Sequence, residues 1–469
     1  MANWYDKLIQ RLLVGNMTEA QIMELELKEH LASEKTKMMK EAYNYYRNKT
    51  KIKSKTKHMD AEWKANSKIA MGLFKKFVDQ KVGYLFSNAP TITIDGADDD
   101  QEFINDVFDE ETLQVFKSLG KEAIIKGTAY AMPYYNEEGR LRLLKIPSEQ
   151  IIPFWKDERH NELDAFMRVY LQPFYEAGSK RYKTIVEYWD EEGVKEFEYV
   201  LGKLKATNSE PQAHFYYSVE GSSTREPYVW DKLPLIPFRA NEEEDSLLVQ
   251  VKELIDNLEL QASTNADVLA DLPNFVYVLK NYDGTDLNEF MKNLNLFRSV
   301  KVRSDGGVDK LQGTTDTNGA ESEIARTRKE LYESASAIDT QDENLGNASG
   351  IALQWRYTDL DLNCNDLENE FQKGIQQFLW FVGSYAETIG QSVDLETFKY
   401  EFNRDVISNE SEAIENCVKS VGILDGKTIR EQHPWYTPEV EIRLEKEKQE
   451  LEHEYDFEDD THEHEEAES

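Results

Sequence analysis

The sequence predicts an α+β protein that is mainly helical, and three patterns carry this prediction. Apolar residues recur every three or four positions from Leu353 to Val382, which is the stripe of one long helix. Residues 128–147 and 185–200 alternate with a period of two around short turns, as the strands of hairpins do. Between residues 241 and 338, a small α/β insert separates two amphipathic helices of comparable length.

Residues 1–32 read as an amphipathic helix, and a basic run follows them. Residues 35–57 hold nine Lys and Arg together with Tyr43, Tyr45 and Tyr46. Basic residues interleaved with aromatic ones could stack on nucleic acid. The same run is typical of a solvated helix end and loop, and the acidic balance of the whole chain favours this second interpretation.

The segment NSKIAMGLFKKFVDQKVGYLFSNAP, residues 66–90, predicts a second helix. Ile69, Leu73 and Phe77 share one face of it. The carboxylates at 98–100 could bind a divalent cation. The alternating oxygen ligands of a calcium loop are missing there, however, so a solvated acidic turn is favoured.

Another helix is expected over Phe103–Lys126, ending at Gly127. The two hairpins that follow turn at Asn136–Gly139 and at Asp190–Gly193. This mixed region closes with YVWDKLPLIPFRANEEE, where two prolines are expected to end the sheet. Residues 1–240 therefore make up the first region of the chain.

The stretch from 241 to 338 predicts a paired stalk that carries a knob. Its first helix, over 241–270, aligns apolar residues from Leu247 to Ala262 on one face. The insert 271–318 contains the strands FVYVLK and VKVR with a helix between them, at 287–296. The second helix, over 319–338, places Leu331 and Ile338 on one face.

A loop at 339–348 leads into the long helix, which is predicted over 349–390. Asn347 or Ser349 can cap its start, since either side chain accepts from a backbone N–H of the first turn. From Leu353 to Val382 this helix would be a rod of roughly 45 Å. Gly346 and Gly350 are expected hinges, because glycine adopts backbone conformations that other residues avoid. The loop residues of interest are Asp339, Gln341, Asp342, Glu343, Asn344, Leu345, Gly346 and Asn347.

Residues 391–452 predict one strand and two helices. The first helix would open at Asn409 or Ser411, and the second near residues 437–438. The acidic tail 453–469 is expected to be disordered. His462 and His464 could chelate a metal, but no folded frame is predicted around them and a solvated tail is favoured.

Composition limits the possible functions. The chain has 469 residues, 90 Asp and Glu against 55 Lys and Arg, and a net charge of −35. Such a charge argues against tight wrapping of nucleic acid, which needs a basic footprint, but it permits a surface that repels phosphates. Two cysteines indicate a reducing compartment and no disulfide framework. No signal peptide and no membrane-spanning run is predicted.

The motifs of common enzymes are missing from the sequence. The loop LGNASG lacks the Gly-Lys-Ser/Thr ending of a phosphate-binding loop. Neither a G-x-S-x-G nor an H-E-x-x-H pattern occurs, and the eight histidines form no pattern with Cys or Ser. The sequence therefore predicts no enzyme, no cofactor and no metal site.

Four stretches in order give the chain a family resemblance. They are the helix of residues 66–90, the segment LPLIPFRANEEE, the segment GNASGIALQWRYTDL, and FNRDVISNESEAIENCVKS with the charged helix after it. On these stretches the chain resembles the portal proteins of tailed bacteriophages, of the long-tailed siphophage type that infects Gram-positive hosts. The resemblance runs from about Asn66 to Glu450.

The resemblance implies a portal fold that forms a ring of twelve subunits around a DNA channel. Within that fold, 1–240 and the spine helix 349–390 would be the wing, 241–270 and 319–338 the stem, and 391–452 the crown. The clip would be 271–318, and the tunnel loop 339–348 would line the channel with the residues named above.

The resemblance also implies a role in the virion. The ring would occupy one capsid vertex, assemble in the host cytoplasm, and serve genome packaging, initiation of capsid assembly, tail attachment and DNA ejection. Its partners would be the large terminase subunit, which is the packaging ATPase, head-completion or adaptor proteins, and capsid and scaffolding proteins. Double-stranded DNA would pass through without sequence-specific binding, and no membrane would be involved.

Two alternatives belong to other classes of protein. An acidic, non-enzymatic scaffold or adaptor, monomeric or dimeric, would bind only protein partners. A nucleic-acid-processing enzyme is disfavoured, because no catalytic constellation is present in the sequence.

Overall fold

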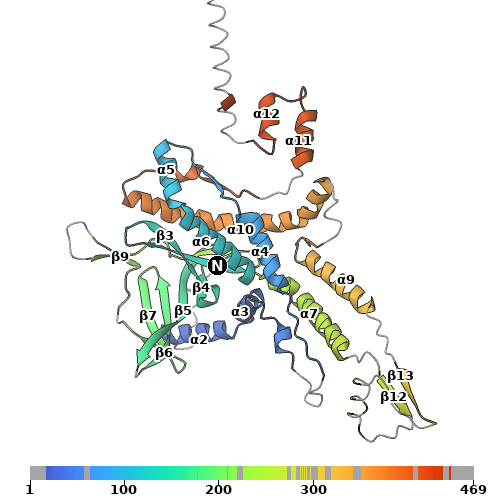
Figure 1. Cartoon of the computed structure of the whole chain (residues 1–469). Coiled ribbons are helices and arrows are strands. Elements are labelled where there is room, and N and C mark those ends of the chain that lie inside the picture. The colour runs from blue at the N-terminus through green and yellow to red at the C-terminus, as the bar shows by residue number, and fades with distance from the viewer. Residues whose placement is uncertain are drawn as a thin grey trace, which may run out of the picture. The chain divides into compact units, whose positions relative to one another are not determined.

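The computed structural model describes the chain apart from residues 1–16, 57–63, 177, 209, 219–224, 272–275, 281–285, 287, 289, 291, 293–295, 297–304, 312–317, 342–349, 405–409, 437–442 and 445–469. It contains both helices and antiparallel sheets, in agreement with the predicted α+β class (Figure 1). Two compact units divide the chain. One comprises Met1–Ala337 and Leu360–Arg404, and the other comprises Ile338–Asp359 and Asp405–Ser469.

The helices differ from the predicted ones mainly at their ends. They are α2 (Glu19–Ala32), α3 (Glu34–Tyr46), α4 (Leu73–Phe86), α5 (Asp98–Val107), α6 (Glu110–Lys126), α7 (Leu247–Asp271), α9 (Asn318–Ser334), α10 (Gly350–Thr388), α11 (Glu410–Lys419) and α12 (Gly426–Glu431). Short 3-10 turns lie at Lys51–Ser54, Ser148–Gln150 and Leu395–Thr397.

The single helix expected over Phe103–Lys126 is wrong, because the chain breaks it into α5 and α6. Phe108 leaves the helical conformation, and the Asp109 side chain accepts from the backbone N–H of Thr112 at 3.0 Å, which caps α6. The acidic residues 98–100 form the first turn of α5 rather than a loop, where the helix dipole favours negative charge. The predicted end at Gly127 is confirmed.

Two further helix boundaries also differ from prediction. Gly72 has a φ of +66° and starts α4 at Leu73, so Ile69 is outside the helix and partly exposed. The second stalk helix ends at Ser334, before the Ile338 that was expected on its face.

The strands form antiparallel sheets. They are β1 (Thr91–Thr93), β2 (Thr128–Tyr135), β3 (Leu141–Ile146), β4 (Ile151–Trp155), β5 (Leu163–Glu176), β6 (Ser179–Asp190), β7 (Gly193–Val200), β8 (Lys203–Ala206), β9 (Phe215–Ser218), β10 (Arg225–Tyr228), β11 (Ile236–Arg239), β12 (Val276–Lys280), β13 (Gly307–Leu311) and β14 (Lys399–Glu401). One sheet has the order β4-β5-β6-β7-β8 and another the order β11-β2-β3, with pairs β1-β14, β9-β10 and β12-β13.

Both predicted hairpin turns are present, but the prolines do not end the sheet. β2 and β3 turn at residues 136–140, and Asp190 pairs directly with Gly193 across the turn between β6 and β7. Pro237 lies inside β11, opposite Tyr130 of β2. The edge position of β11 makes this possible, because proline cannot donate to a second neighbour.

The spine helix α10 supplies one side of the main core. Of the predicted stripe, Leu360, Cys364, Leu367, Phe371, Ile375, Phe378 and Val382 are buried. Phe371 lies against the rings of Phe116 and Phe238, with centroids 5.9 and 4.6 Å away. The stripe therefore packs α10 against α6 and the β2 sheet. The proposed caps Asn347 and Ser349 lie outside the described residues.

The basic run 35–57 keeps most of its charged side chains exposed, as the favoured interpretation expects, but some of its tyrosines are packed. Its first half is α3, where Tyr45 is buried and donates from its hydroxyl to Asp256 at 2.6 Å. Tyr46 donates to Asp79 of α4 at 2.9 Å. The tyrosines are therefore part of the contacts among α3, α4 and α7.

The region after the spine splits between the two units. β14 pairs with β1, with Thr91 opposite Glu401, and so belongs with the first unit. In the second unit, α12 was not predicted and is capped by Asp425, which accepts from the N–H groups of Lys427 and Thr428. The helix expected near 437–438, the tail 453–469 and the strand VKVR lie outside the described residues.

Candidate functional site

The predicted tunnel loop is described only at its start and just after its end. Asp339 accepts from the backbone N–H of Gln341 at 3.0 Å, and Gly350 is the first residue of α10. The loop residues Asp342, Glu343, Asn344, Leu345, Gly346 and Asn347 lie outside the described residues. The predicted site in this loop therefore stays a prediction.

A different set of polar residues converges where the sheet region meets the stalk. Gly127 adopts a φ of +89°, and a Cβ atom there would lie 2.0 Å from the carbonyl oxygen of Glu244. The N–H of Ala240 donates to the carbonyl of Gly127 at 2.8 Å. Only glycine allows this close approach, which holds the end of α6 against the turn that precedes α7.

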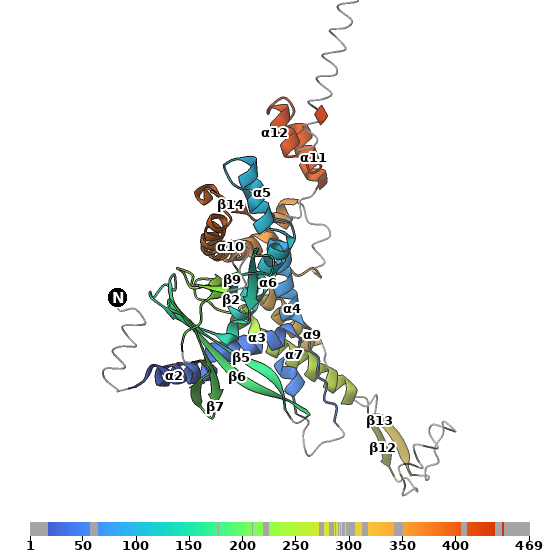
Figure 2. The same ribbon diagram turned by 90° about the vertical axis from the view of Figure 1, so that its left-hand side faces the viewer.

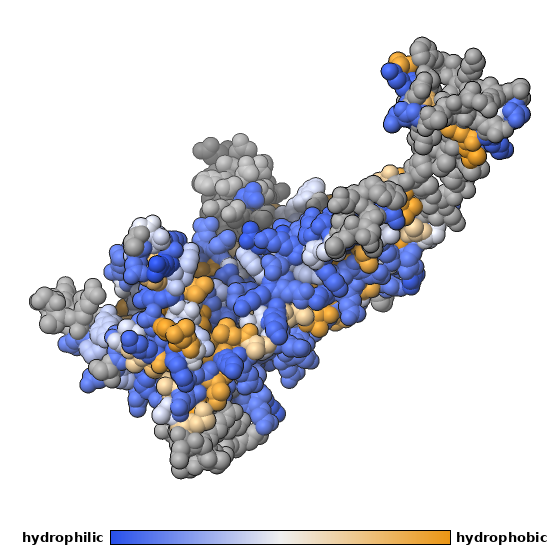
Figure 3. Space-filling model, turned by 90° about the horizontal axis from the view of Figure 1, so that it is seen from below, coloured by the Kyte–Doolittle hydropathy of each residue, from blue (hydrophilic) through white to orange (hydrophobic). Residues whose placement is uncertain are grey.

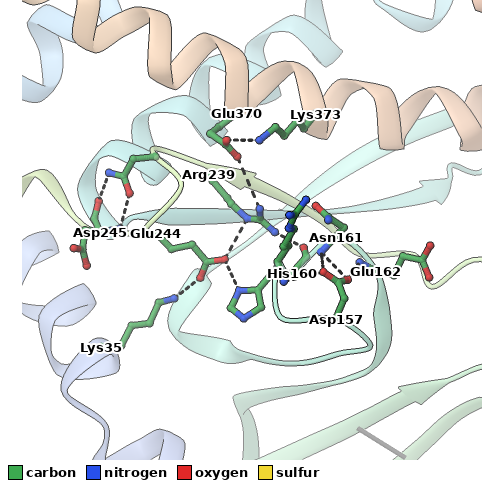
Figure 4. Close-up of polar contacts among 12 residues, drawn as sticks. Lys35, Asp157, His160, Asn161, Glu162, Arg239, Glu244, Asp245, Glu370 and Lys373 are labelled. Carbon is green, nitrogen blue, oxygen red and sulfur yellow. Dashed lines mark hydrogen bonds and ion pairs between the residues drawn. The ribbon is translucent and has the colours of Figure 1, made fainter. Parts of the chain in front are cut away.

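Glu244 is the centre of this junction, which we define as Lys35, His160, Arg239, Glu244 and Glu370 (Figure 4). It has a φ of +59° and is buried. Its carboxylate contacts the ammonium of Lys35, Nδ1 of His160 at 3.0 Å and Nε of Arg239 at 3.2 Å. Burial alone would raise the pKa of Glu244, but the hydrogen bonds and charges of His160 and Lys35 lower it to about 2.

Arg239 connects the junction to the spine. Its Nη1 lies 3.9 Å from Oε2 of Glu370 on α10, and its Nη2 donates to the carbonyl of His160. The guanidinium also lies over the ring of Trp155, 5.7 Å from the centroid, and that ring stacks on His160. Charged side chains thus connect α3, β11, the root of α7 and α10.

A second polar feature runs along α7. Asp256, Glu259, Ser263 and Asp267 lie three or four residues apart, and we call them the acceptor stripe. Three of them accept from backbone N–H groups of residues 64–71, the strap. The bonds are Ser67 to Asp267 at 2.5 Å, Ile69 to Ser263 at 3.0 Å and Met71 to Glu259 at 2.8 Å.

The spacing of the stripe explains this fit. Alternate residues of an extended chain are about 6.6 Å apart, and residues four apart on a helix are separated by about 6.0 Å. An N–H at every second strap residue can therefore meet an acceptor at every fourth helix residue. Lys55 and the hydroxyls of Tyr45 and Thr50 contact the same stripe.

Glu259 and Ser263 of the stripe are fully buried. Burial raises the pKa of Glu259, although the hydrogen bonds from Thr50 and Met71 oppose that shift. Near the other end of the stalk, Lys81 of α4 is also buried and donates to Oδ1 of Asn363 on α10 at 2.7 Å. Burial lowers the pKa of Lys81 to about 8.

The sequence analysis missed these residues, although weak signals for them exist. The stripe appears as polar positions spaced by three or four within an amphipathic helix, next to its apolar face. Gly127 is visible as a helix end, but its contact with Glu244 joins residues far apart in the chain.

The chemistry of these groups is structural. Within the part of the chain that the structure describes, no group of His, Cys, Asp and Glu could hold a metal ion. No helix among those residues is long and apolar enough to span a membrane. The charges of the junction and of the stripe are satisfied by other parts of the same chain, so both features fix the position of one element on another.

Comparison with known proteins gives the following similarities. A family model described as phage portal protein, SPP1 Gp6-like, matches residues 25–455. The portal protein of Bacillus phage SPP1 is 32% identical over 393 residues, which cover 81% of this chain and 75% of that protein. The portal protein of Clostridium phage phiCD119 is 28% identical over 422 residues, covering 84% and 88%. A chain from the neck of an empty gene transfer agent particle aligns with a TM-score of 0.43 at 10% identity, covering 77% of this chain and 89% of that one.

Proposed function

The chain belongs to the SPP1 Gp6-like family of phage portal proteins, and from this premise we propose that copies of it form a ring around a DNA channel at one capsid vertex. Its function is that of a bacteriophage portal protein, a structural component of the virion. The observation that carries the proposal is the family match over residues 25–455, which includes both stalk helices and the spine.

Within this ring the parts of the chain take distinct roles. Residues 1–240 and the spine 349–390 form the wing, the helices of 241–270 and 319–338 form the stem, and 391–452 form the crown. The clip 271–318 meets the packaging ATPase, which is the large terminase subunit, and later the head-completion proteins. Capsid and scaffolding proteins bind the outside of the ring during assembly.

The contacts of the junction and of the acceptor stripe are suited to a ring that is under mechanical force from moving DNA. DNA moving through a channel pushes on the stem, and a stem that rotated freely against the wing would not transmit this force. Directional hydrogen bonds fix register as well as distance. The stripe and the Glu244 contacts would thus hold each stem helix to its own wing.

The tunnel loop 339–348 forms the narrowest part of the channel. DNA carries one charge per about 1.7 Å of axis, so a wall with Asp339, Asp342 and Glu343 keeps it centred without binding it. Gly346 and Gly350 act as hinges of the loop. The chain itself hydrolyses no nucleotide, since packaging energy comes from the separate ATPase.

Electron microscopy of the purified chain in negative stain tests the ring. We expect particles with a central hole and a mass, by light scattering, of about twelve chains. Small solid particles of one or two chains would instead favour the acidic scaffold or adaptor. Robust ATP hydrolysis by protein free of the motor would contradict the non-enzymatic role.

Charge reversal in the loop tests the channel. We expect Asp342→Lys with Glu343→Lys, and separately Gly350→Val, to leave rings intact and to reduce DNA packaging in reconstituted heads. A matched double reversal on exposed turns, Glu137→Lys with Glu192→Lys, should package normally. Normal packaging by the loop variants would place the loop away from the DNA path.

A further inference from the structure

The hairpin of β5 and β6 is much longer than the strands beside it. β4 pairs with β5 only up to Arg168, and β7 pairs with β6 only from Thr184. Beyond those points the two strands continue to pair with each other as far as Glu176 and Ser179. Residues 169–183, which we call the distal hairpin, therefore form a two-stranded ribbon outside the sheet (Figure 2).

One face of the distal hairpin is apolar and open to solvent. Leu171, Pro173 and Tyr175 alternate along β5 and therefore share a face, on which Tyr182 lies opposite Pro173. Leu171 is 64% exposed, Tyr175 78% and Tyr182 58%. Orange hydrophobic residues reach the surface among blue ones on the side of the molecule seen in Figure 3. Large exposed apolar groups held on one face of a ribbon are typical of a contact surface.

The charge of the distal hairpin is opposite to that of the chain. It carries Lys180, Arg181 and Lys183 against one acidic residue, Glu176, whereas the whole chain has a net charge of −35. Arg181 pairs with Glu176 at 2.9 Å, and Lys180 lies over the Tyr182 ring, 5.5 Å from its centroid. Lys180 lies opposite Tyr175 and shares the apolar face, whereas Arg181 and Lys183 lie on the other face. The apolar face thus presents one basic and several apolar groups on a strongly acidic molecule.

Two observations favour face-on docking over strand addition or free exposure. A two-stranded ribbon alone is marginal in water and gains from a partner surface. Pro173 on the open side of β5 has no N–H and discourages pairing with a further strand. A partner would therefore cover the apolar face, and Lys180 on that face favours an acidic partner.

We infer that the distal hairpin docks on the acidic surface of a second copy of this chain, and that it is a subunit contact of the ring. A second copy supplies both required properties, since each chain is strongly acidic and exposes apolar residues. This inference rests on the proposed ring. DNA would satisfy the basic residues but would leave the apolar face uncovered.

The test uses the full chain in sedimentation velocity over a range of concentrations. The variant Tyr175→Asp with Lys180→Glu changes an apolar and a basic group that lie opposite each other on the apolar face. We expect it to need about tenfold or more protein to assemble, because like charges then face each other. Its matched control, Leu201→Asp with Lys205→Glu, changes the exposed tip and strand of the β7–β8 hairpin and should assemble as the native chain does.

The outcomes separate this inference from the ring itself. A native chain that forms rings and a hairpin variant that forms them equally well would overturn the hairpin contact and leave the ring standing. A native chain that forms no ring would overturn both. Circular dichroism verifies that the variant is folded, which the exposure of both changed residues leads us to expect.

Cross-linking identifies the molecule that contacts the distal hairpin directly. Tyr175→Cys can be labelled selectively with a photoreactive maleimide, because Cys364 and Cys417 are both buried. In a mixture of ¹⁵N-labelled and unlabelled chains, we expect cross-linked peptides that combine the two isotopes. Cross-links within one chain only, or to added DNA in place of protein, would overturn the inference.

Discussion

The spine α10 and the helix α7 are both long helices of one chain, yet they are held in different ways. α10 is held by an apolar stripe in an aromatic cluster around Phe371. α7 begins in the same manner, with Leu248, Val251, Ile255 and Leu258 buried, and then depends on the acceptor stripe. Burial is non-directional, whereas hydrogen bonds fix which residue meets which. The contacts of α10 are therefore suited to stability, and those of α7 to a fixed register.

The difference also predicts how each helix responds to solution conditions. Apolar contacts of the spine do not depend on pH, while the contacts of Glu244 and Glu259 do. Substitutions in the apolar stripe of α10 and substitutions of Glu244 or of the acceptor stripe should thus have different effects. We expect them to differ in the loss of free energy of unfolding, in the pH dependence of that loss and in how many backbone amides become less protected.

The largest effect should follow Phe371→Ala in the spine. The side chain is fully buried among Phe86, Phe116 and Phe238, so its removal leaves a cavity. We expect a loss of about 3–5 kcal/mol in the free energy of unfolding, with little dependence on pH. Urea unfolding followed by circular dichroism measures it. Leu362→Ala on the same helix, where the side chain is 58% exposed, should change little.

A somewhat smaller and pH-dependent effect should follow Glu244→Gln at the junction. The folded pKa of about 2 lies below the usual 4.5, so the ionised carboxylate stabilises the fold above pH 4.5 and this stabilisation disappears as the pH falls to about 2. We expect a cost of about 3 kcal/mol at pH 7, to order of magnitude, from a shift of that size. Urea unfolding at pH 7 and pH 3 measures it.

The control for Glu244 is its exposed neighbour Glu242. Glu242→Gln should leave stability unchanged at both pH values. If the difference between native chain and Glu244→Gln were the same at pH 3 as at pH 7, the charge of Glu244 would not be what holds the root of the stem.

Substitutions in the acceptor stripe should cause a moderate loss of stability. This loss should depend more on whether the new side chain can accept a hydrogen bond than on the volume of that side chain. Glu259→Ala leaves the N–H of Met71 without its acceptor, at a cost of about 1–3 kcal/mol. Glu259→Gln keeps an acceptor oxygen and removes a charge whose burial raises the pKa, so it should cost much less near neutral pH. Equal losses for the two variants would show that packing holds the strap.

Amide hydrogen exchange localises this effect. The Met71 N–H should exchange faster in Glu259→Ala than in the native chain, while amides of α10 stay protected. Glu253→Ala, at an exposed position of the same helix, serves as the control.

The smallest effect should follow Ser263→Ala. This change removes one neutral hydrogen bond, from the N–H of Ile69, and we expect a loss of about 1 kcal/mol. Faster exchange at Ile69 than at Met71 would verify that each stripe residue secures its own strap amide. Thr264→Ala, next to it on the exposed side of α7, should have no such effect. Uniform loosening of the whole strap would contradict the one-to-one pairing.

The sequence by itself determined the elements whose signals are local. The stripe from Leu360 to Val382, the turn at Asn136–Gly139 and the helix end at Gly127 were all predicted, because side-chain period and turn chemistry are properties of neighbouring residues. Local signals were weaker at boundaries. The break before Asp109 and the start of α4 at Leu73 were missed there, since a cap or a single left-handed glycine outweighed a continuous apolar pattern.

Only the tertiary structure decided how those elements are joined. Met71 meets Glu259 across 188 positions and Lys35 meets Glu244 across 209, and no local pattern announces such partners. Tyr45 and Pro237 illustrate the same limit. The sequence suggested nucleic-acid stacking or a solvated helix end for Tyr45 and the end of the sheet for Pro237, yet Tyr45 is buried against α7 and Pro237 lies within an edge strand. A charged or polar residue can be hydrated by solvent or paired with a buried partner. Only the folded chain supplies the partner whose contact offsets the free-energy cost of desolvation.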